Sequence, residues 1–280
     1  MRYAITGTTG LVGGTLRRWL EARGHEVRAL DRVVGGGGAR FVLGEPIARD
    51  ALAGVHALVH CAHDWRPRAW ADVERVNVAG SLALFRSSET AGVPRRLFVS
   101  TISAWEGGRS QYGRGKLAVE AAVRAAGGLV VRPGLVWGAD GRGMFAGLAR
   151  VARLPVLPLF DGGRQPLFLV HVEDLAALLA HAIERAPAGG PPITAAHPEP
   201  LTFRAVLERL AAQHGRRPRF VPVPGALVLA GLRAAEVLGA GLAFRSDSLL
   251  GLLHANPAPD FTPQAALGLR PRPFAGASGE

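Results

Sequence analysis

Tyr112 and Lys116, four residues apart, are the side chains in this sequence best suited to acid–base chemistry. On a helix this spacing places both on one face, one turn apart. A tyrosine ordinarily has a pKa of about 10, and a neighbouring positive charge favours its phenolate form. Lys116 is the only lysine among 33 basic residues, and all the others are arginines. This position therefore carries a compact ammonium group in place of a planar guanidinium. We therefore expect Tyr112 to act as a general acid or base whose pKa Lys116 lowers.

Hydroxyl side chains follow the apolar run that precedes this predicted helix. Thr101 stands where the strand ends, and Ser103 comes two residues later. We expect Thr101 to hydrogen-bond a substrate oxygen beside the phenol, with Ser103 as the alternative. An exposed helical Tyr and Lys beside a strand-end Thr, without any chemistry, is an equal reading of these residues alone.

The first residues of the chain predict a dinucleotide-binding turn. A β-rich run at 2–6 leads into Gly7, Gly10 and Gly13, an amphipathic helix follows, and a second strand at 26–30 ends at Asp31. Such glycines let the backbone approach a pyrophosphate, whose charge rests on the N–H groups of the helix N-terminus. Asp31 would accept hydrogen bonds from the adenosine ribose and repel a second phosphate there. NAD is therefore the predicted cofactor, with NADP as the alternative because Arg32 is adjacent.

Further cofactor contacts are predicted at the ends of later strands. Glu45 follows the third strand and could meet an adenine amine, although a surface acid is an equal interpretation. Small residues after the fourth strand would let the backbone approach a flat ring. No third ligand accompanies His60 and His63, so no metal site is predicted. The predicted cofactor-binding residues are Gly7, Thr9, Gly10, Leu11, Val12, Gly13, Asp31, Arg32, Glu45, His60, Cys61, Ala62, Asn77, Tyr112, Lys116 and Pro133.

Alternating strands and helices predict the α/β class, with a doubly wound, Rossmann-like parallel sheet and a smaller C-terminal substrate-binding cap. Residues 1–150 are expected to form the dinucleotide-binding domain, with 167–186 returning to it, and residues 187–280 the cap. The third strand is predicted at 40–43. Only residues 32–39 lead to it, fewer than parallel crossovers usually need, so a connection without a helix is expected.

Composition excludes several classes of function. The formal charge is +11, yet the arginines are scattered and aromatic residues make up only 6%, so no nucleic-acid partner is expected. The longest apolar stretch, 224–244, is interrupted by Arg233 and Glu236, which favours buried helices over a membrane span. Cys61 is the only cysteine, so no internal disulfide can form. With no leader-like start, a cytoplasmic location is expected.

With these residues placed, the chain resembles the extended short-chain dehydrogenase/reductase family, in its NAD-dependent epimerase/dehydratase branch. Residues 6–13, TGTTGLVG, resemble the family's TGxxGxxG turn, and Tyr112 and Lys116 match its YxxxK pair. Asn77 matches the family's helix asparagine. The segments RPGLVWG at 132–138 and HVEDLA at 171–176 resemble its RPxxxYG and HVxDxA motifs. The resemblance covers residues 1–185 and, more loosely, the remainder.

This resemblance implies roles for the site residues. Tyr112 would move a proton on or off a substrate hydroxyl or carbonyl, Lys116 would lower its pKa and hold the nicotinamide ribose, and Thr101 would bond the same oxygen. The implied activity is an NAD(P)-dependent oxidoreductase or epimerase/dehydratase acting on a small molecule. A homodimer packed through the helices at 69–91 and 111–126 is also implied.

Two departures from the family pattern bear on the substrate. Sugar-nucleotide members carry arginines that grip the diphosphate, whereas Leu167 and residues 253–254 stand at those places here. A less charged carbonyl or alcohol is therefore as well supported as a sugar nucleotide. The alternative function is a non-catalytic NAD(P)-sensing regulator of the same fold, which the retained Tyr112 and Lys116 disfavour.

Overall fold

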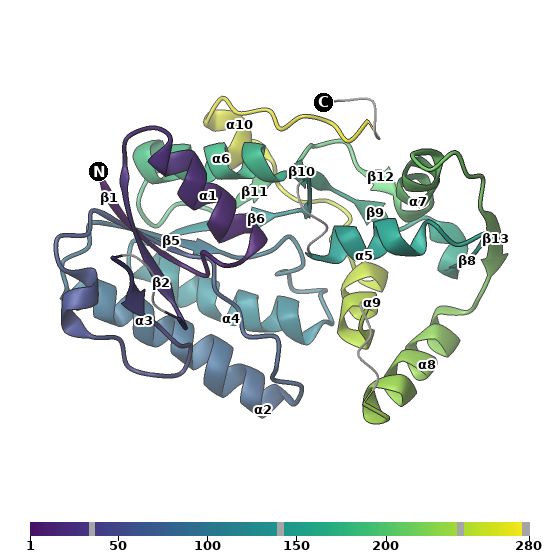
Figure 1. Cartoon of the computed structure of the whole chain (residues 1–280), viewed down its shortest axis with the longest axis horizontal. Coiled ribbons are helices and arrows are strands. Elements are labelled where there is room, and N and C mark those ends of the chain that lie inside the picture. Colours follow the sequence, from purple (N-terminus) through teal and green to yellow (C-terminus); the bar gives the residue numbers. More distant parts are fainter. Residues whose placement is uncertain (34–36, 139–142, 240–243, 276–280) are drawn as a thin grey trace.

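A parallel sheet organises the computed structural model, which describes residues 1–33, 37–138, 143–239 and 244–275 (Figure 1). Within these residues the sheet has seven strands in the order β11-β6-β5-β4-β1-β2-β3. The strands are β1 (Arg2–Thr6), β2 (Glu26–Asp31), β3 (Ala39–Arg40), β4 (Ala57–His60), β5 (Arg95–Val99), β6 (Leu129–Pro133) and β11 (Ile193–Ala195). This order, which steps outward from β1 in both directions, confirms the predicted doubly wound α/β fold.

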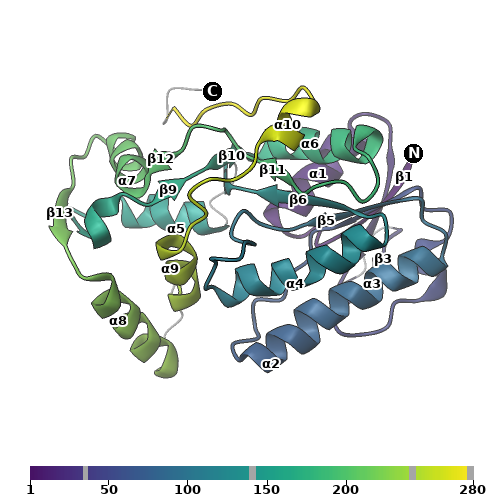
Figure 2. The ribbon, with the colours of Figure 1, turned by 180° about the vertical axis from the view of Figure 1, so that it is seen from behind.

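Helices cover both faces of the sheet, as a buried parallel sheet requires (Figure 2). On one face, α1 (Leu11–Glu21) and α6 (Val172–Arg185) pack on alternate strand residues such as Tyr3 and Ile5. On the other, α3 (Ala79–Thr90) and α4 (Gln111–Ala125) pack on Phe98 and Val130. α3 continues from α2 (Trp70–Val73) through a π-helical turn, Glu74–Val78. A short 3-10 turn, Arg49–Leu52, precedes β4.

The third strand is shorter than predicted. β3 spans two residues, and the chain then turns away at Val42, whose carbonyl accepts from the Glu45 amide, and at Gly44, where φ is +88°. Pairing is nevertheless parallel, with Leu30 opposite Ala39. Part of the glycine-rich connection, residues 34–36, lies outside the described residues.

A second apolar core lies beside the sheet and combines residues between 148 and 169 with residues of the predicted cap, 187–280. Its helices are α5 (Gly143–Val151), α7 (Phe203–Ala212), α8 (Gly225–Val237) and α9 (Ser246–Leu253). Short strand pairs join them: β7 (Leu135–Trp137) with β10 (Leu169–His171), β8 (Val156–Leu159) with β13 (Arg219–Pro222), and β9 (Pro166–Leu167) with β12 (Leu201–Thr202). A 3-10 turn, Phe160–Gly163, follows β8.

The C-terminal third of the chain contributes to both cores. β11 extends the central sheet by pairing with β6, and α10 (Thr262–Ala266) packs on β11. Residues 193–195 and 262–266 therefore join the central sheet, although they fall within the predicted cap range of 187–280. The predicted boundaries at 150 and 187 stay a prediction.

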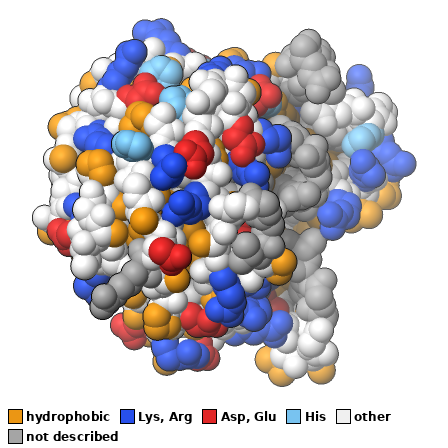
Figure 3. Space-filling view, turned by 60° about the vertical axis from the view of Figure 1, so that its left-hand side comes forward, with side chains coloured by type: hydrophobic (Ala, Val, Ile, Leu, Met, Phe, Trp, Pro, Cys, Tyr) orange, Lys and Arg blue, Asp and Glu red, His pale blue; other side chains and the backbone are white. Residues whose placement is uncertain are grey.

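Charges of both signs are interspersed on the face seen in Figure 3, where arginines lie among aspartates and glutamates. This distribution agrees with the scattered arginines of the sequence. Among the described residues, no helix is both long and apolar enough to cross a membrane.

A buried ion pair locks α4 onto the sheet. Glu120, on α4, is 3% exposed, and its carboxylate accepts from Arg132 Nε at 3.0 Å and from the Ser100 hydroxyl. Arg132 lies on β6, and Ser100 directly follows β5. Glu120 is one turn beyond Lys116, so the ion pair fixes the register of the helix that carries Tyr112 and Lys116.

Replacing this carboxylate should destabilise the protein substantially. In Glu120→Gln the Arg132 guanidinium loses its charged partner, and we expect the free energy of unfolding to fall by about 3 kcal/mol. Urea denaturation measures this change. Glu208→Gln is the matched control, since it breaks the exposed Arg204–Glu208 pair and should cost less than about 0.5 kcal/mol. Equal effects of the two substitutions would contradict the structural role of Glu120.

Candidate active site

The glycine turn brings backbone close to backbone at the carboxyl end of β1. Gly7 has φ +73°, and a Cβ added there would lie 3.0 Å from Ala62 Cα. A Cβ added to Gly13 would lie 2.4 Å from the Gly7 carbonyl oxygen, closer than any real contact. Only glycine at these positions lets α1 begin this near the sheet. The turn therefore leaves the N-terminus of α1 facing the space that an anionic group needs.

Asp31 is fixed at the end of β2 by the same turn. Its Oδ1 accepts from the Thr8 amide at 2.9 Å, and its Oδ2 accepts from the Thr8 hydroxyl. The carboxylate is thus held at the rim of the turn, where ribose hydroxyls bind in dinucleotide folds. Together with the glycine cradle, it fits an NAD adenosine and pyrophosphate.

The predicted acid–base residues meet at the start of α4. Ser110 caps this helix by accepting from the Gly113 amide at 3.0 Å. Tyr112, in the first turn, shares the cavity lining with Thr101 and Ser103, and Thr101 is close enough to lower the pKa of the phenol. Lys116 donates to the Val99 carbonyl at 2.8 Å, and its Nζ lies 6.0 Å from the centroid of the Tyr112 ring. The structure thus brings the three side chains together.

Burial dominates the ionisation of both groups. It raises the pKa of Tyr112 to about 12, while the hydrogen bond with Thr101 acts in the opposite direction. Burial also lowers the pKa of Lys116 to about 8, opposed by Cys61 and Glu120. The sequence predicted that Lys116 would lower the pKa of Tyr112, and in this structure that prediction is wrong because burial of the phenol is the largest influence and raises its pKa.

Aromatic rings enclose the phenol. The Trp65 ring stacks on Tyr112 with centroids 4.9 Å apart, and the His63 ring meets it edge-on, also at 4.9 Å. Burial lowers the pKa of His63 to about 3, so this imidazole is neutral near pH 7. Trp65 itself is 60% exposed and extends toward solvent. The two rings cover part of Tyr112, whose side chain is half-buried on the wall of the large cavity.

One cavity of about 970 Å³ contains both halves of the site. Most predicted residues line it: Gly7, Thr9, Gly10, Leu11, Val12, Gly13, Asp31, Arg32, Cys61, Ala62, Thr101, Ser103, Tyr112, Lys116 and Pro133. Other residues line the cavity without having been predicted to do so: His63, Trp65, Leu135, Val136, Met144, Phe168, Asp247, Ser248, Leu252 and Asn256. Leu135 and Val136 lie within the RPGLVWG segment, whereas the cap residues among the others belong to no motif and reach the cavity only through the tertiary fold.

Three residues predicted to contact the cofactor lie away from the described cavity lining. Glu45 is exposed and pairs with Arg40 at 2.7 Å. His60 is buried in the core, with Nδ1 2.7 Å from the Thr6 hydroxyl and Nε2 2.9 Å from the Ser81 hydroxyl. Asn77 exchanges two hydrogen bonds with the Asp64 backbone, accepting at 2.8 Å and donating at 3.0 Å. Asn77 therefore holds the segment after β4, which carries Trp65.

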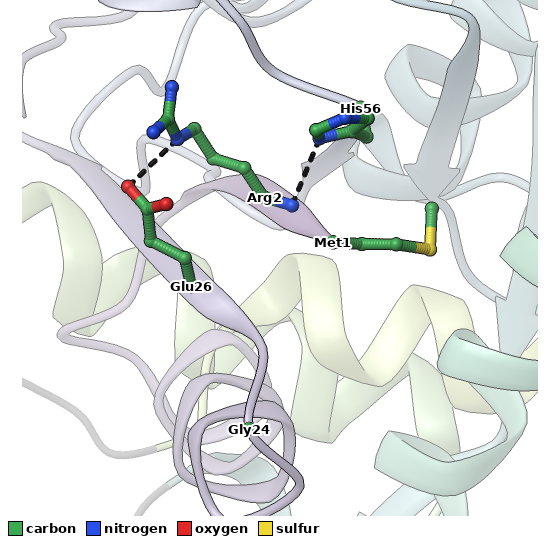
Figure 4. A pocket seen from close by; sticks show the side chains of 5 residues that line it. All are labelled: Met1, Arg2, Gly24, Glu26 and His56. Carbon is green, nitrogen blue, oxygen red and sulfur yellow. Dashed lines mark hydrogen bonds and ion pairs between the residues drawn. The ribbon is translucent and has the colours of Figure 1, made fainter.

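A smaller cavity of about 380 Å³ lies at the opposite, amino end of the sheet. It is lined by Met1, Arg2, Gly24, Glu26 and His56, with the Arg2–Glu26 ion pair across it (Figure 4). In open parallel sheets, ligands bind outside the carboxyl ends of the strands, so this cavity is not the candidate active site.

The comparisons with known proteins agree with this geometry. The model of the NAD dependent epimerase/dehydratase family matches residues 3–194. The chain belongs to this family. It is therefore an enzyme of the short-chain dehydrogenase/reductase type, and its cofactor is NAD.

Named relatives are reductases. A ceramide reductase of Caulobacter vibrioides is 31% identical over 94% of this chain and 87% of its own. A 4-hydroxy-2-methyl-3-oxo-4-farnesyl-3,4-dihydroquinoline-1-oxide ketoreductase of Stigmatella aurantiaca is 29% identical over 86% of this chain and 80% of its own. A short-chain dehydrogenase/reductase superfamily protein from Agrobacterium tumefaciens, solved with NAD, shares the fold. Its TM-score is 0.68 at 22% identity, over 89% of this chain and 95% of its own.

Filling the glycine cradle should abolish cofactor binding. In Gly13→Ala the new methyl group meets the Gly7 carbonyl, so the turn must open, and we expect NADH affinity to fall at least about 100-fold. Fluorescence titration with NADH measures this. Gly231→Ala, on α8 with nothing within 4 Å of the added Cβ, is the control and should bind NADH normally. Unchanged affinity in Gly13→Ala would place the cofactor elsewhere.

Proposed function

We propose that this enzyme reduces a carbonyl group on a largely apolar small molecule, with Tyr112 as the proton donor. The observation that carries this proposal is that Thr101, Tyr112 and Lys116 line the same cavity as the glycine turn. A phenol whose pKa is raised to about 12 holds its proton throughout the physiological range. It is therefore present in the protonated form that carbonyl reduction requires of a proton donor.

Each residue has one role in this proposal. Bound in the glycine cradle, NAD in its reduced form would supply the hydride that the carbonyl carbon accepts. Thr101 and Tyr112 hold the carbonyl oxygen with their hydroxyl groups, and Tyr112 gives it a proton as negative charge develops. The Lys116 ammonium stabilises the phenolate that remains, because an opposite charge nearby favours the ionised form.

The cap side of the cavity favours an apolar substrate. Its lining includes Leu135, Val136, Leu167, Phe168 and Leu252, and Trp65 adds an aromatic face beside the phenol. Leu167 is the residue that replaces the diphosphate-binding arginine of sugar-nucleotide enzymes. Arg66, which also lines the cavity, is already paired with Asp64 at 2.5 Å. The relatives named for ceramide and for a farnesyl-bearing ketone support the same class of substrate.

Assembly and location complete the proposal. We propose a homodimer that packs through α3 and α4, which lie side by side on one face of the sheet, and light scattering would measure its mass.

A cytoplasmic location suits the single cysteine, Cys61. Binding of NADP in place of NAD is the alternative at Arg32, and paired titrations with the two cofactors decide between them.

Removing the phenol hydroxyl should stop turnover and leave the cofactor site intact. We expect Tyr112→Phe to lower kcat about 100- to 10,000-fold, since general acid catalysis is lost. The assay is oxidation of NADH with a β-keto ester that carries a long alkyl chain. NADH affinity, measured by fluorescence, should stay unchanged. Full turnover in this variant would refute the role of Tyr112, whereas a wild-type enzyme inactive on such ketones but active on sugar nucleotides would refute the substrate class.

The reaction should depend on pH through Lys116. Reduction needs Tyr112 protonated and Lys116 charged, and Lys116, with a pKa of about 8, loses its charge first as pH rises. We therefore expect kcat/KM for carbonyl reduction to be flat below pH 8 and to fall above it. Lys116→Arg, whose guanidinium stays charged, should be less active but should extend the plateau to higher pH. An identical fall in Lys116→Arg would assign the titration to another group.

A further inference from the structure

Helix α9 of the cap lies against the start of α4, between the two cores (Figures 1 and 2). Asp247, in the first turn of α9, uses both carboxylate oxygens on α4. Its Oδ1 accepts from the Gln111 amide at 2.6 Å and its Oδ2 from the Tyr112 amide at 3.1 Å. A side chain of the cap is therefore bonded to the backbone of the proposed proton donor.

These two amides belong to the groups that a helix cannot satisfy by itself. The first N–H groups of a helix have no partner within it. The Ser110 hydroxyl takes the Gly113 amide, and Asp247 takes the two that precede it. A negative charge is also favourable at a helix N-terminus. The turn that carries Tyr112 is thus completed by a residue 135 positions later in the chain.

The remainder of α9 contacts the loop that precedes α4. At its C-terminal end, the His254 carbonyl accepts from Trp105 Nε1 at 3.0 Å. In its middle, a Cβ added to Gly251 would lie 3.7 Å from Ser110 Cβ, an ordinary contact distance. Its N-terminal end is tied to α8, because Glu236 accepts from the Ser246 amide at 2.8 Å. α9 therefore follows the segment from Trp105 to Tyr112 along its whole length.

Further residues of α9 line the large cavity, where we propose that the substrate binds. Ser248, Gly251 and Leu252 line the large cavity together with Tyr112. A molecule that fills the cap side of the cavity would therefore touch the same helix that holds the Tyr112 backbone. One helix, α9, would therefore both contact the substrate and hold the backbone of Tyr112 in place.

We infer that Asp247 is a positioning residue that couples the substrate-binding cap to the proton donor Tyr112. It acts through the backbone of the first turn of α4 and does not touch the reacting atoms. The inference rests on the proposed function in one respect, namely that Tyr112 is the group whose position matters. The charged or titratable groups that face Tyr112 are His63 after β4, Lys116 on its own helix and Asp247 on α9.

Two readouts test this role, one of them without turnover. The chain has two tyrosines, Tyr3 and Tyr112, so in a Tyr3→Phe background the phenolate absorbance reports Tyr112 alone. At pH about 10, where an ordinary tyrosine is half ionised, the parent should show little phenolate. Asp247→Ala should show clearly more, because the loosened turn admits water to the phenol. In the NADH assay with a long-chain β-keto ester, kcat should fall about 10- to 100-fold, as for a misplaced catalytic group.

Two further variants separate positioning from charge and from general stability. Asp247→Asn loses the charge but keeps one acceptor, so both effects should be intermediate. Asp260→Asn is the matched control, since Asp260 accepts from the Thr262 amide at 2.8 Å at the start of α10, away from the cavity. NADH affinity should stay within about twofold in all variants, because the glycine turn is distant.

Each possible outcome either supports or overturns the positioning role of Asp247. Equal phenolate signals in Asp247→Ala and Asp247→Asn would mean that charge alone acts, which overturns the positioning role. Unchanged kcat in Asp247→Ala, an equal loss in Asp260→Asn, or a parallel loss of NADH binding would overturn it as well. If the wild-type chain does not turn over the ester, the proposed substrate fails, and the phenolate signal still decides the role of Asp247.

Discussion

Partial burial of the Tyr112 phenol beside Lys116, on the wall of the large cavity, is the constraint on which the rest of the structure depends. A tyrosine in water ionises near pH 10, and here burial raises its pKa to about 12. Burial also lowers the pKa of Lys116 to about 8, so the two groups differ far more in pKa than they would in water, and the phenol holds its proton more firmly than the ammonium does. In the proposed reaction, Tyr112 donates its proton as charge develops on a substrate oxygen, because the ammonium then gains an anionic neighbour.

The fold supplies this environment by converging several elements at the carboxyl ends of the strands. The glycine turn brings the backbone of α1 to the sheet, and the Glu120–Arg132 pair fixes α4 over β5 and β6. Asn77 holds the segment that places Trp65 against the phenol. The Glu120 carboxylate and the Asn77 amide would be costly to bury without partners, and each is hydrogen-bonded to a residue on another segment.

Local motifs predicted much of this arrangement because their chemistry is contiguous. The glycine spacing and Asp31 predicted the turn, and the four-residue spacing predicted the pairing of Tyr112 with Lys116. The role of Asp247, the enclosure by Trp65 and the core position of His60 were beyond such reasoning, since each depends on contacts between distant segments. The direction of the Tyr112 pKa was missed for the same reason: the sequence shows the neighbouring charge but not the loss of water.

The most direct test of this account is the ionisation of Tyr112 in the Tyr3→Phe protein without cofactor. Phenolate absorbance is followed as pH rises, with circular dichroism to confirm that the chain stays folded. The account predicts little phenolate at pH about 10, where a solvated tyrosine is half ionised. A phenol that titrates below that pH in the folded protein would show that the ammonium outweighs burial, and it would contradict the neutral proton donor proposed above.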